Sequence, residues 1–121
     1  MLIFECINQS ENTVIANRVF SARSLWSRIQ GLIGRVSLPP EEGIWLIPCR
    51  QVHTCFMKFP IHVIFLDENR RVLDCIAAMP PWRISPFYRH AHSVLELSGL
   101  TPVPGLKNGD QTLFREKRAE Q

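Results

Sequence analysis

The chain has no long hydrophobic run and no leader-like segment at its start. No apolar stretch approaches the roughly 18 to 20 residues that a membrane-spanning helix needs. Residues 1–5 also lack the basic head and apolar stretch of a signal peptide. We therefore expect a cytoplasmic protein that has no membrane among its partners.

The sequence also lacks the motifs that mark common ligand sites. It has no Gly-x-Gly-x-x-Gly, no phosphate loop and no Cys-x-x-Cys pair among its four cysteines. Its 14 Lys and Arg exceed its 11 Asp and Glu, but they are spread along the chain rather than gathered into a stripe. A nucleic-acid partner is therefore disfavoured. With no export signal, the cysteines are expected to be thiols, mostly buried.

The composition is that of one folded unit. The chain has 121 residues, of which 45% are hydrophobic and 21% are charged, and this length leaves no room for a second core. We expect a single globular domain over residues 1–114. The tail at 115–121 has nothing to bury and is expected to be flexible.

Periodicity predicts a mainly-β fold with one short helix. Residues 2–20 alternate around a polar turn, which fits two strands joined as a hairpin. Apolar residues then recur at steps of three and four, which predicts a helix over 22–31. Because no helical pattern separates the later strands, we expect a sandwich or barrel-like fold. These strands are short runs rich in β-branched and aromatic residues, at 44–47, 52–58, 61–66, 72–78, 91–97 and 111–114.

The densest group of reactive side chains lies at residues 49–57. Alternate residues of a strand share a face, so His53, Cys55 and Met57 would point together. With Cys49 and His62 they form a weak candidate site for zinc or copper, His62 joining only if the two predicted strands pair. Two or three donors are too few for a closed site, so we favour a buried strand with a hydrogen-bonded histidine and expect no cofactor.

The same strand pattern assigns the faces of this segment. Val52 and Phe56 are expected to face the core, which turns the residues between them toward a groove. Cys55 is then half-buried beside His53, whereas Cys75, in an apolar run, is expected to be inert core.

Trp82 and Arg83 follow two prolines, which place an aromatic ring and a cation on a rigid extended segment. This pair could line a groove, or Trp82 could close one end of the barrel, and we favour the second interpretation.

A nucleophilic Cys55 activated by His62 would need a base within hydrogen-bond reach and an oxyanion hole. The sequence indicates neither.

Several segments together resemble one family, the domain of unknown function family numbered 192, over residues 14–114. The resemblance implies a compact β-sandwich-like domain with a short helix and without an established activity, and many relatives are exported. The matching segments, in order, are Gln30 to Arg35, Gly43 to Cys49, Val52 to Ile61, Val63 to Asp67, Pro81 to Arg83, Val94 to Leu97 and Gly109-Asp110.

Two positions depart from the family pattern. Where the pattern usually has an aspartate this chain has His62, and the usual Ala-Gly step near Ser98-Gly99-Leu100 is shifted or lost. Histidine can donate as well as accept near neutral pH, whereas an ionised aspartate only accepts. A salt bridge from that aspartate to a neighbouring arginine would therefore be lost.

We interpret the chain as a non-enzymatic small-ligand-binding or accessory module, lined by Arg35, His53, Met57 and Trp82. Polar and sulfur-bearing groups in apolar surroundings are typical of concave ligand sites. Two alternatives stay open. One is a metal-dependent or hydrolytic enzyme using His53, Cys55 and His62, and the other is a structural component of a larger assembly, recognisable by an exposed apolar patch. The partner, a small molecule or a protein, is left open.

Overall fold

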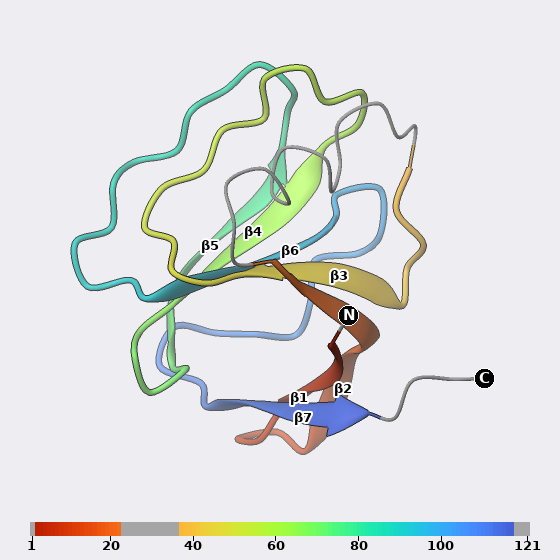
Figure 1. Ribbon diagram of the computed structural model, residues 1–121, viewed down its shortest axis with the longest axis vertical. Coiled ribbons are helices and arrows are strands. Elements are labelled where there is room, and N and C mark those ends of the chain that lie inside the picture. Colours follow the sequence, from red (N-terminus) through yellow and green to blue (C-terminus); the bar gives the residue numbers. More distant parts are fainter. Residues whose placement is uncertain (1, 23–36, 118–121) are drawn as a thin grey trace.

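The computed structural model describes residues 2–22 and 37–117, which form one strongly curved sheet (Figure 1). Its spatial order is β5-β4-β6-β3-β2-β1-β7, and β2 with β3 is the parallel pair. The prediction of a mainly-β fold is confirmed. The strands are β1 (Ile3–Asn8), β2 (Thr13–Ala22), β3 (Glu42–Leu46), β4 (Ile61–Leu66), β5 (Val72–Met79), β6 (Ser93–Ser98) and β7 (Thr112–Lys117).

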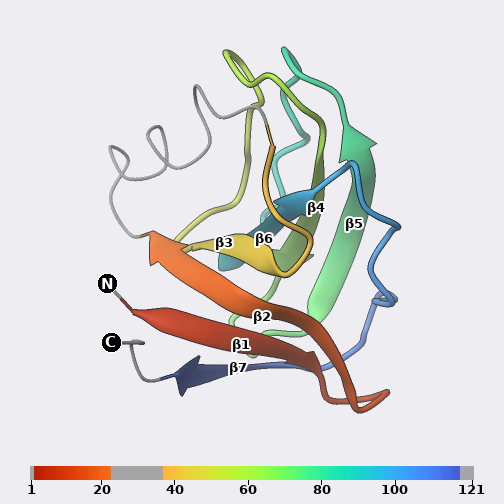
Figure 2. The ribbon, with the colours of Figure 1, turned by 90° about the vertical axis from the view of Figure 1, so that its right-hand side faces the viewer.

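The sheet bends until its two edge strands meet at one end. Arg71, just before β5, pairs with Gln111, just before β7. Beside this bridge the N–H of Val72 donates to the carbonyl of Asp110 at 2.9 Å. Figure 2 shows the bend from the side, with β1, β2 and β7 turned away from β4 and β5. The result is barrel-like, because curvature brings the two edges together.

Apolar side chains pack on both faces of the central strands. Trp45, Ile64 and Leu95 lie inside the bend with residues of β1, β2 and β7. Ile61, Val63 and Phe65 point to the opposite face, where loop residues cover them. All six residues of β4 are consequently buried. A strand covered on both faces reads as a continuous apolar run, which is how it appears in the sequence.

The predicted strand at 52–58 is wrong. These residues form a loop whose single ladder contact is the bridge between His53 and Ile84. The N–H of Met57 turns back to the carbonyl of Thr54, and Phe56 has a φ of +68°. A run of β-branched and aromatic residues favours extended backbone, but that backbone pairs as a strand only where a neighbouring strand is in register.

Two other predictions concern the helix expected at 22–31 and the tail expected at 115–121. The predicted helix at 22–31 lies outside the described residues apart from Ala22, which ends β2. The tail predicted to begin at 115 starts too early, because β7 continues to Lys117 and pairs with β1. Arg115 adds an ion pair to Glu5 at 2.8 Å. The prediction relied on the lack of apolar residues in this segment, which is held instead by backbone pairing with β1 and by an ion pair.

Within the described residues, no helix has the length and hydrophobicity needed to span a bilayer.

Candidate functional site

Two long loops lie side by side over the side of the sheet to which Ile61, Val63 and Phe65 of β4 point. We call these loops, residues 47–60 and 80–92, the loop layer. The loops run past each other in Figure 1 between the ends of β3, β4, β5 and β6. Backbone hydrogen bonds hold them together, from the N–H of Thr54 to the carbonyl of Arg83 (2.9 Å), from Ser85 to Val52 (2.9 Å) and from Tyr88 to Arg50 (2.8 Å).

The loop layer is anchored to the sheet through several side chains that point inward. Val52, Met57 and Phe59 are buried in the core beneath it. The ring of Tyr88 stacks on Phe65 with centroids 3.9 Å apart. The Tyr88 hydroxyl donates to the carboxylate of Asp74 on β5, and desolvation followed by this hydrogen bond raises the pKa of Tyr88 to about 12. These contacts give the loops a fixed position without regular secondary structure.

Thr54 is the central hydrogen-bonding residue of the layer. It is fully buried, its hydroxyl donates to the carbonyl of Pro80 at 2.6 Å, and the same oxygen accepts the N–H of Arg83 at 2.9 Å. Its backbone carbonyl accepts the N–H of Trp82 at 3.0 Å. One residue of the first loop therefore sets the backbone path of residues 80–83 in the second.

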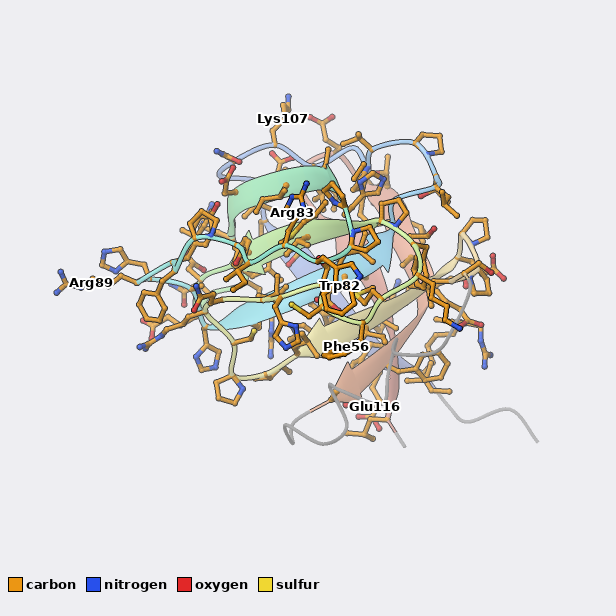
Figure 3. All side chains as sticks on the ribbon, turned by 90° about the horizontal axis from the view of Figure 1, so that it is seen from above. Phe56, Trp82, Arg83, Arg89, Lys107 and Glu116 are labelled. Atoms are coloured by element: carbon orange, nitrogen blue, oxygen red, sulfur yellow. The ribbon has the colours of Figure 1, made fainter. Side chains whose placement is uncertain are left out.

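Phe56 and Trp82 form an exposed aromatic pair above Thr54. Their ring centroids are 4.7 Å apart and the planes are inclined at 59°. Both residues have left-handed backbone, with φ of +68° and +64°, a conformation that costs a bulky residue about 1–3 kcal/mol and is concentrated at functional sites. In Figure 3 the two side chains lie beside Arg83 in the middle of the view. Strained backbone that presents rings to solvent marks this pair as the candidate site.

The loop layer has further exposed apolar and cationic side chains and no acidic residue. Ile84 and Phe87 are exposed large apolar residues of the second loop, while Lys58 and Arg83 add exposed cations. We call this set, with Phe56 and Trp82, the outer face. An exposed apolar patch is the feature expected of a structural component of a larger assembly.

Three of the four predicted ligand-binding residues lie in the loop layer, and two of these are exposed. Trp82 is exposed on the outer face, and His53 is exposed with its Nδ1 accepting the N–H of Cys55 at 3.3 Å. Met57 is buried in the core, so the predicted faces are wrong at this point: Phe56 is outside and Met57 inside. The turn at 54–57 breaks the alternation on which the prediction relied. Arg35 lies outside the described residues.

Sequence reasoning missed Phe56 as a site residue. An alternating pattern assigns it to the core, and a positive φ at an aromatic residue leaves no signature in composition or spacing. The only available signal was its closeness in sequence to the reactive segment.

The weak metal candidates are not assembled around one point. His62 is almost fully buried, with Nε2 donating to the carbonyl of Thr101 at 2.8 Å and Nδ1 accepting the N–H of Ala78 at 3.0 Å. The thiol of Cys49 is buried and donates to the carbonyl of Gln51 at 3.3 Å. Across residues 2–22 and 37–117, no three His, Cys, Asp or Glu side chains are grouped so as to hold a metal ion.

Residues 6–114 match the family DUF192, which is described as an uncharacterized ACR. The chain belongs to the DUF192 family. A UPF0127 protein of Pyrococcus horikoshii is 34% identical over 83 residues, which make up 64% of this chain and 70% of that protein. The resemblance seen in the sequence is thus confirmed, and the family is one without a characterised function.

Solved structures show the same fold. A protein of unknown function from Novosphingobium aromaticivorans superposes with a TM-score of 0.75 at 26% identity, covering 92% of this chain and 83% of its own. A Sinorhizobium meliloti protein described as a candidate transcription regulator gives a TM-score of 0.74 at 20% identity. The match covers 93% of this chain and 92% of that protein. At that identity the second likeness concerns the fold alone.

A hollow of about 510 Å³ lies in another part of the loop layer of this DUF192 protein. Arg50 and Arg89 line it together with the acidic turn at 67–68. The guanidinium of Arg50 is held in place by a hydrogen bond from Nε to the carbonyl of Ala91 at 3.1 Å. Charges of both signs line this hollow, unlike the outer face.

The cysteines of the DUF192 chain differ in exposure and in acidity. Cys55 is half-buried beside His53, as predicted. Cys75 is also half-buried, so its assignment to the inert core is wrong, because β5 is an edge strand with one side uncovered. Burial, and then the neighbouring carboxylate of Asp74, raise the pKa of the Cys75 thiol. Burial raises that of Cys6 to about 12.

We expect iodoacetamide to modify the native thiols in a fixed order near neutral pH. Cys55 should react first and Cys75 more slowly, because a raised pKa leaves less of the reactive thiolate at a given pH. Cys6 and Cys49, both buried, should react only after unfolding. Timed labelling with peptide mapping measures the order, and modification of Cys75 ahead of Cys55 would contradict this assignment.

Proposed function

We propose that this DUF192 protein is a non-enzymatic binding module of the accessory kind, and that the outer face of the loop layer is its contact site. The observation that carries the proposal is the exposed pair Phe56 and Trp82, held on left-handed backbone above the buried Thr54. Neither ring covers the core. A backbone strain with no packing benefit is retained more readily when the displayed rings make contacts with something else.

The surroundings of the pair define the chemistry of a suitable ligand. Two inclined rings offer apolar faces and edges for stacking. Arg83 and Lys58 supply positive charge, with no carboxylate nearby in sequence to neutralise it. A ligand with an apolar body and a negative group would use both features.

The enzymatic alternative has less support. Both ring nitrogens of His62 are hydrogen-bonded to backbone groups, so neither is available to take a proton from Cys55. The Nδ1 of His53 already accepts the backbone N–H of Cys55. A hydrolytic role for these three residues would require the loop layer to rearrange.

The proposal can be tested with 8-anilinonaphthalene-1-sulfonate, a fluorescent aromatic anion. Native protein should bind it at one dominant site, and Phe56→Ala or Trp82→Ala should each weaken binding roughly fivefold or more, through loss of about 1 kcal/mol or more of stacking and apolar contact. Val14→Ala is a matched control, since Val14 is similarly exposed but lies on β2, outside the loop layer.

Circular dichroism should show that all three variants keep the native fold, because the side chains removed are exposed. Equal affinity in native protein and in both aromatic variants would place the binding site elsewhere and overturn the proposal.

A further inference from the structure

We infer that the outer face docks onto an anionic lipid surface, an inference that rests on the proposed binding function and names its partner. The contact is peripheral, with side chains of the loop layer entering the headgroup region. The sequence led us to expect no membrane partner because it contains no spanning segment. A surface contact needs no spanning segment.

Charge is distributed unequally between the loop layer and the rest of the chain. The layer contains four cations, Arg50, Lys58, Arg83 and Arg89, and no Asp or Glu, whereas the rest of the chain has 10 Lys and Arg against 11 Asp and Glu. An anionic surface therefore attracts Lys58 and Arg83, the exposed cations of the outer face, whereas Arg50 and Arg89 line the hollow that the acidic turn at 67–68 also lines. Each Lys or Arg near such a surface contributes about 1 kcal/mol of attraction.

The same surface carries apolar side chains that could insert between headgroups. Phe56, Trp82, Ile84 and Phe87 are 62%, 58%, 69% and 61% exposed. Trp is enriched at membrane interfaces because its ring is apolar and its N–H is polar. Ile84 is aliphatic and offers no face for base stacking, so its place among the exposed residues favours lipid over a single-stranded nucleic acid.

Two backbone N–H groups at the tip of the layer are already paired inside the protein. The N–H groups of Trp82 and Arg83 donate to the carbonyl and hydroxyl of Thr54. Pro80, Pro81 and Pro86 have no N–H to satisfy. A loop tip with paired donors can enter a less polar medium without leaving them unsatisfied.

The pattern of charge suits a fluid anionic surface. A positive patch can also meet a negative patch on a protein, but that contact needs the two sets of charges in register. Here the charges are of one sign, on long side chains interleaved with apolar residues. Such an arrangement suits a fluid layer of negative headgroups, in which partners rearrange around the cations.

Binding to vesicles tests the inference. The probes are phosphatidylcholine vesicles with and without about 30 mol% phosphatidylglycerol, assayed by co-sedimentation and by tryptophan fluorescence. We expect binding to the anionic vesicles only, weakened by salt. Trp82→Ala and Ile84→Ala should each weaken it about fivefold, and Arg83→Glu roughly tenfold or more.

Lys107→Glu is the matched charge control. It makes the same change in net charge at an exposed residue outside the loop layer, distant from Trp82 in Figure 3. Its effect should be small compared with that of Arg83→Glu. Equal losses from the two variants would mean that net charge alone drives binding and would overturn the inference.

Three further outcomes separate this inference from the proposal on which it rests. Retained sulfonate-probe binding without vesicle binding would overturn the lipid partner and leave the binding module intact. Tighter binding to oligothymidylate than to anionic vesicles, lost in Trp82→Ala, would replace lipid by nucleic acid. If the sulfonate probe binds native protein and the aromatic variants with equal affinity, the proposed binding module itself is overturned.

Discussion

Thr54→Val should lower the free energy of unfolding by about 2–4 kcal/mol, although the two side chains are almost identical in shape. The hydroxyl of Thr54 pairs with the carbonyl of Pro80 and the N–H of Arg83, and the residue is fully buried. Valine leaves both backbone groups without this partner, at two hydrogen bonds that are partly buried. Urea unfolding followed by circular dichroism measures the change.

The same substitution should weaken binding at the outer face, because residues 80–83 carry Trp82 and take their path from Thr54. Thr54→Ser is the control: it keeps the hydroxyl and removes one methyl group, for a cost of about 1 kcal/mol. A valine variant as stable as the serine variant would show that the hydroxyl bonds are not what holds the two loops together.

Much of the sheet could be predicted from sequence because burial leaves a pattern there. The run 61–66 is apolar at five of its six positions since β4 is covered on both faces, and the hairpin of β1 and β2 follows from alternation around a polar turn. The order of the strands could not be predicted. The parallel pairing of β2 with β3 and the meeting of β5 with β7 depend on long-range register.

The candidate site was predictable only in part. Trp82 and Arg83 stand out next to two prolines, and His53 stands out in the reactive segment. Phe56 and Met57 exchange their expected positions because one residue with φ of +68° reverses the alternation between core and solvent. The one-signed charge of the layer was visible in the sequence, but its meaning depends on two segments some thirty residues apart lying side by side.

His62 shows a different limit of sequence reasoning. The family pattern suggested that a salt bridge is lost when histidine replaces aspartate. The structure instead places the ring between two backbone groups, with Nδ1 accepting from Ala78 and Nε2 donating to Thr101. Ala78 has a φ of +46°, at an irregularity in the pairing of β4 with β5. An acceptor at this position receives an N–H that the irregular ladder leaves without a strand partner.

His62→Leu should therefore destabilise the fold by about 1–3 kcal/mol, because the ring is buried and the partly buried N–H of Ala78 and carbonyl of Thr101 lose their partner. His62→Asn can keep an acceptor near Nδ1, and His62→Gln a donor near Nε2, so each should lose about half as much. Urea unfolding of the three variants gives the order. If His62→Leu is at least as stable as the native chain, the two backbone contacts contribute nothing net. In that case the histidine would have to be explained by a role in function.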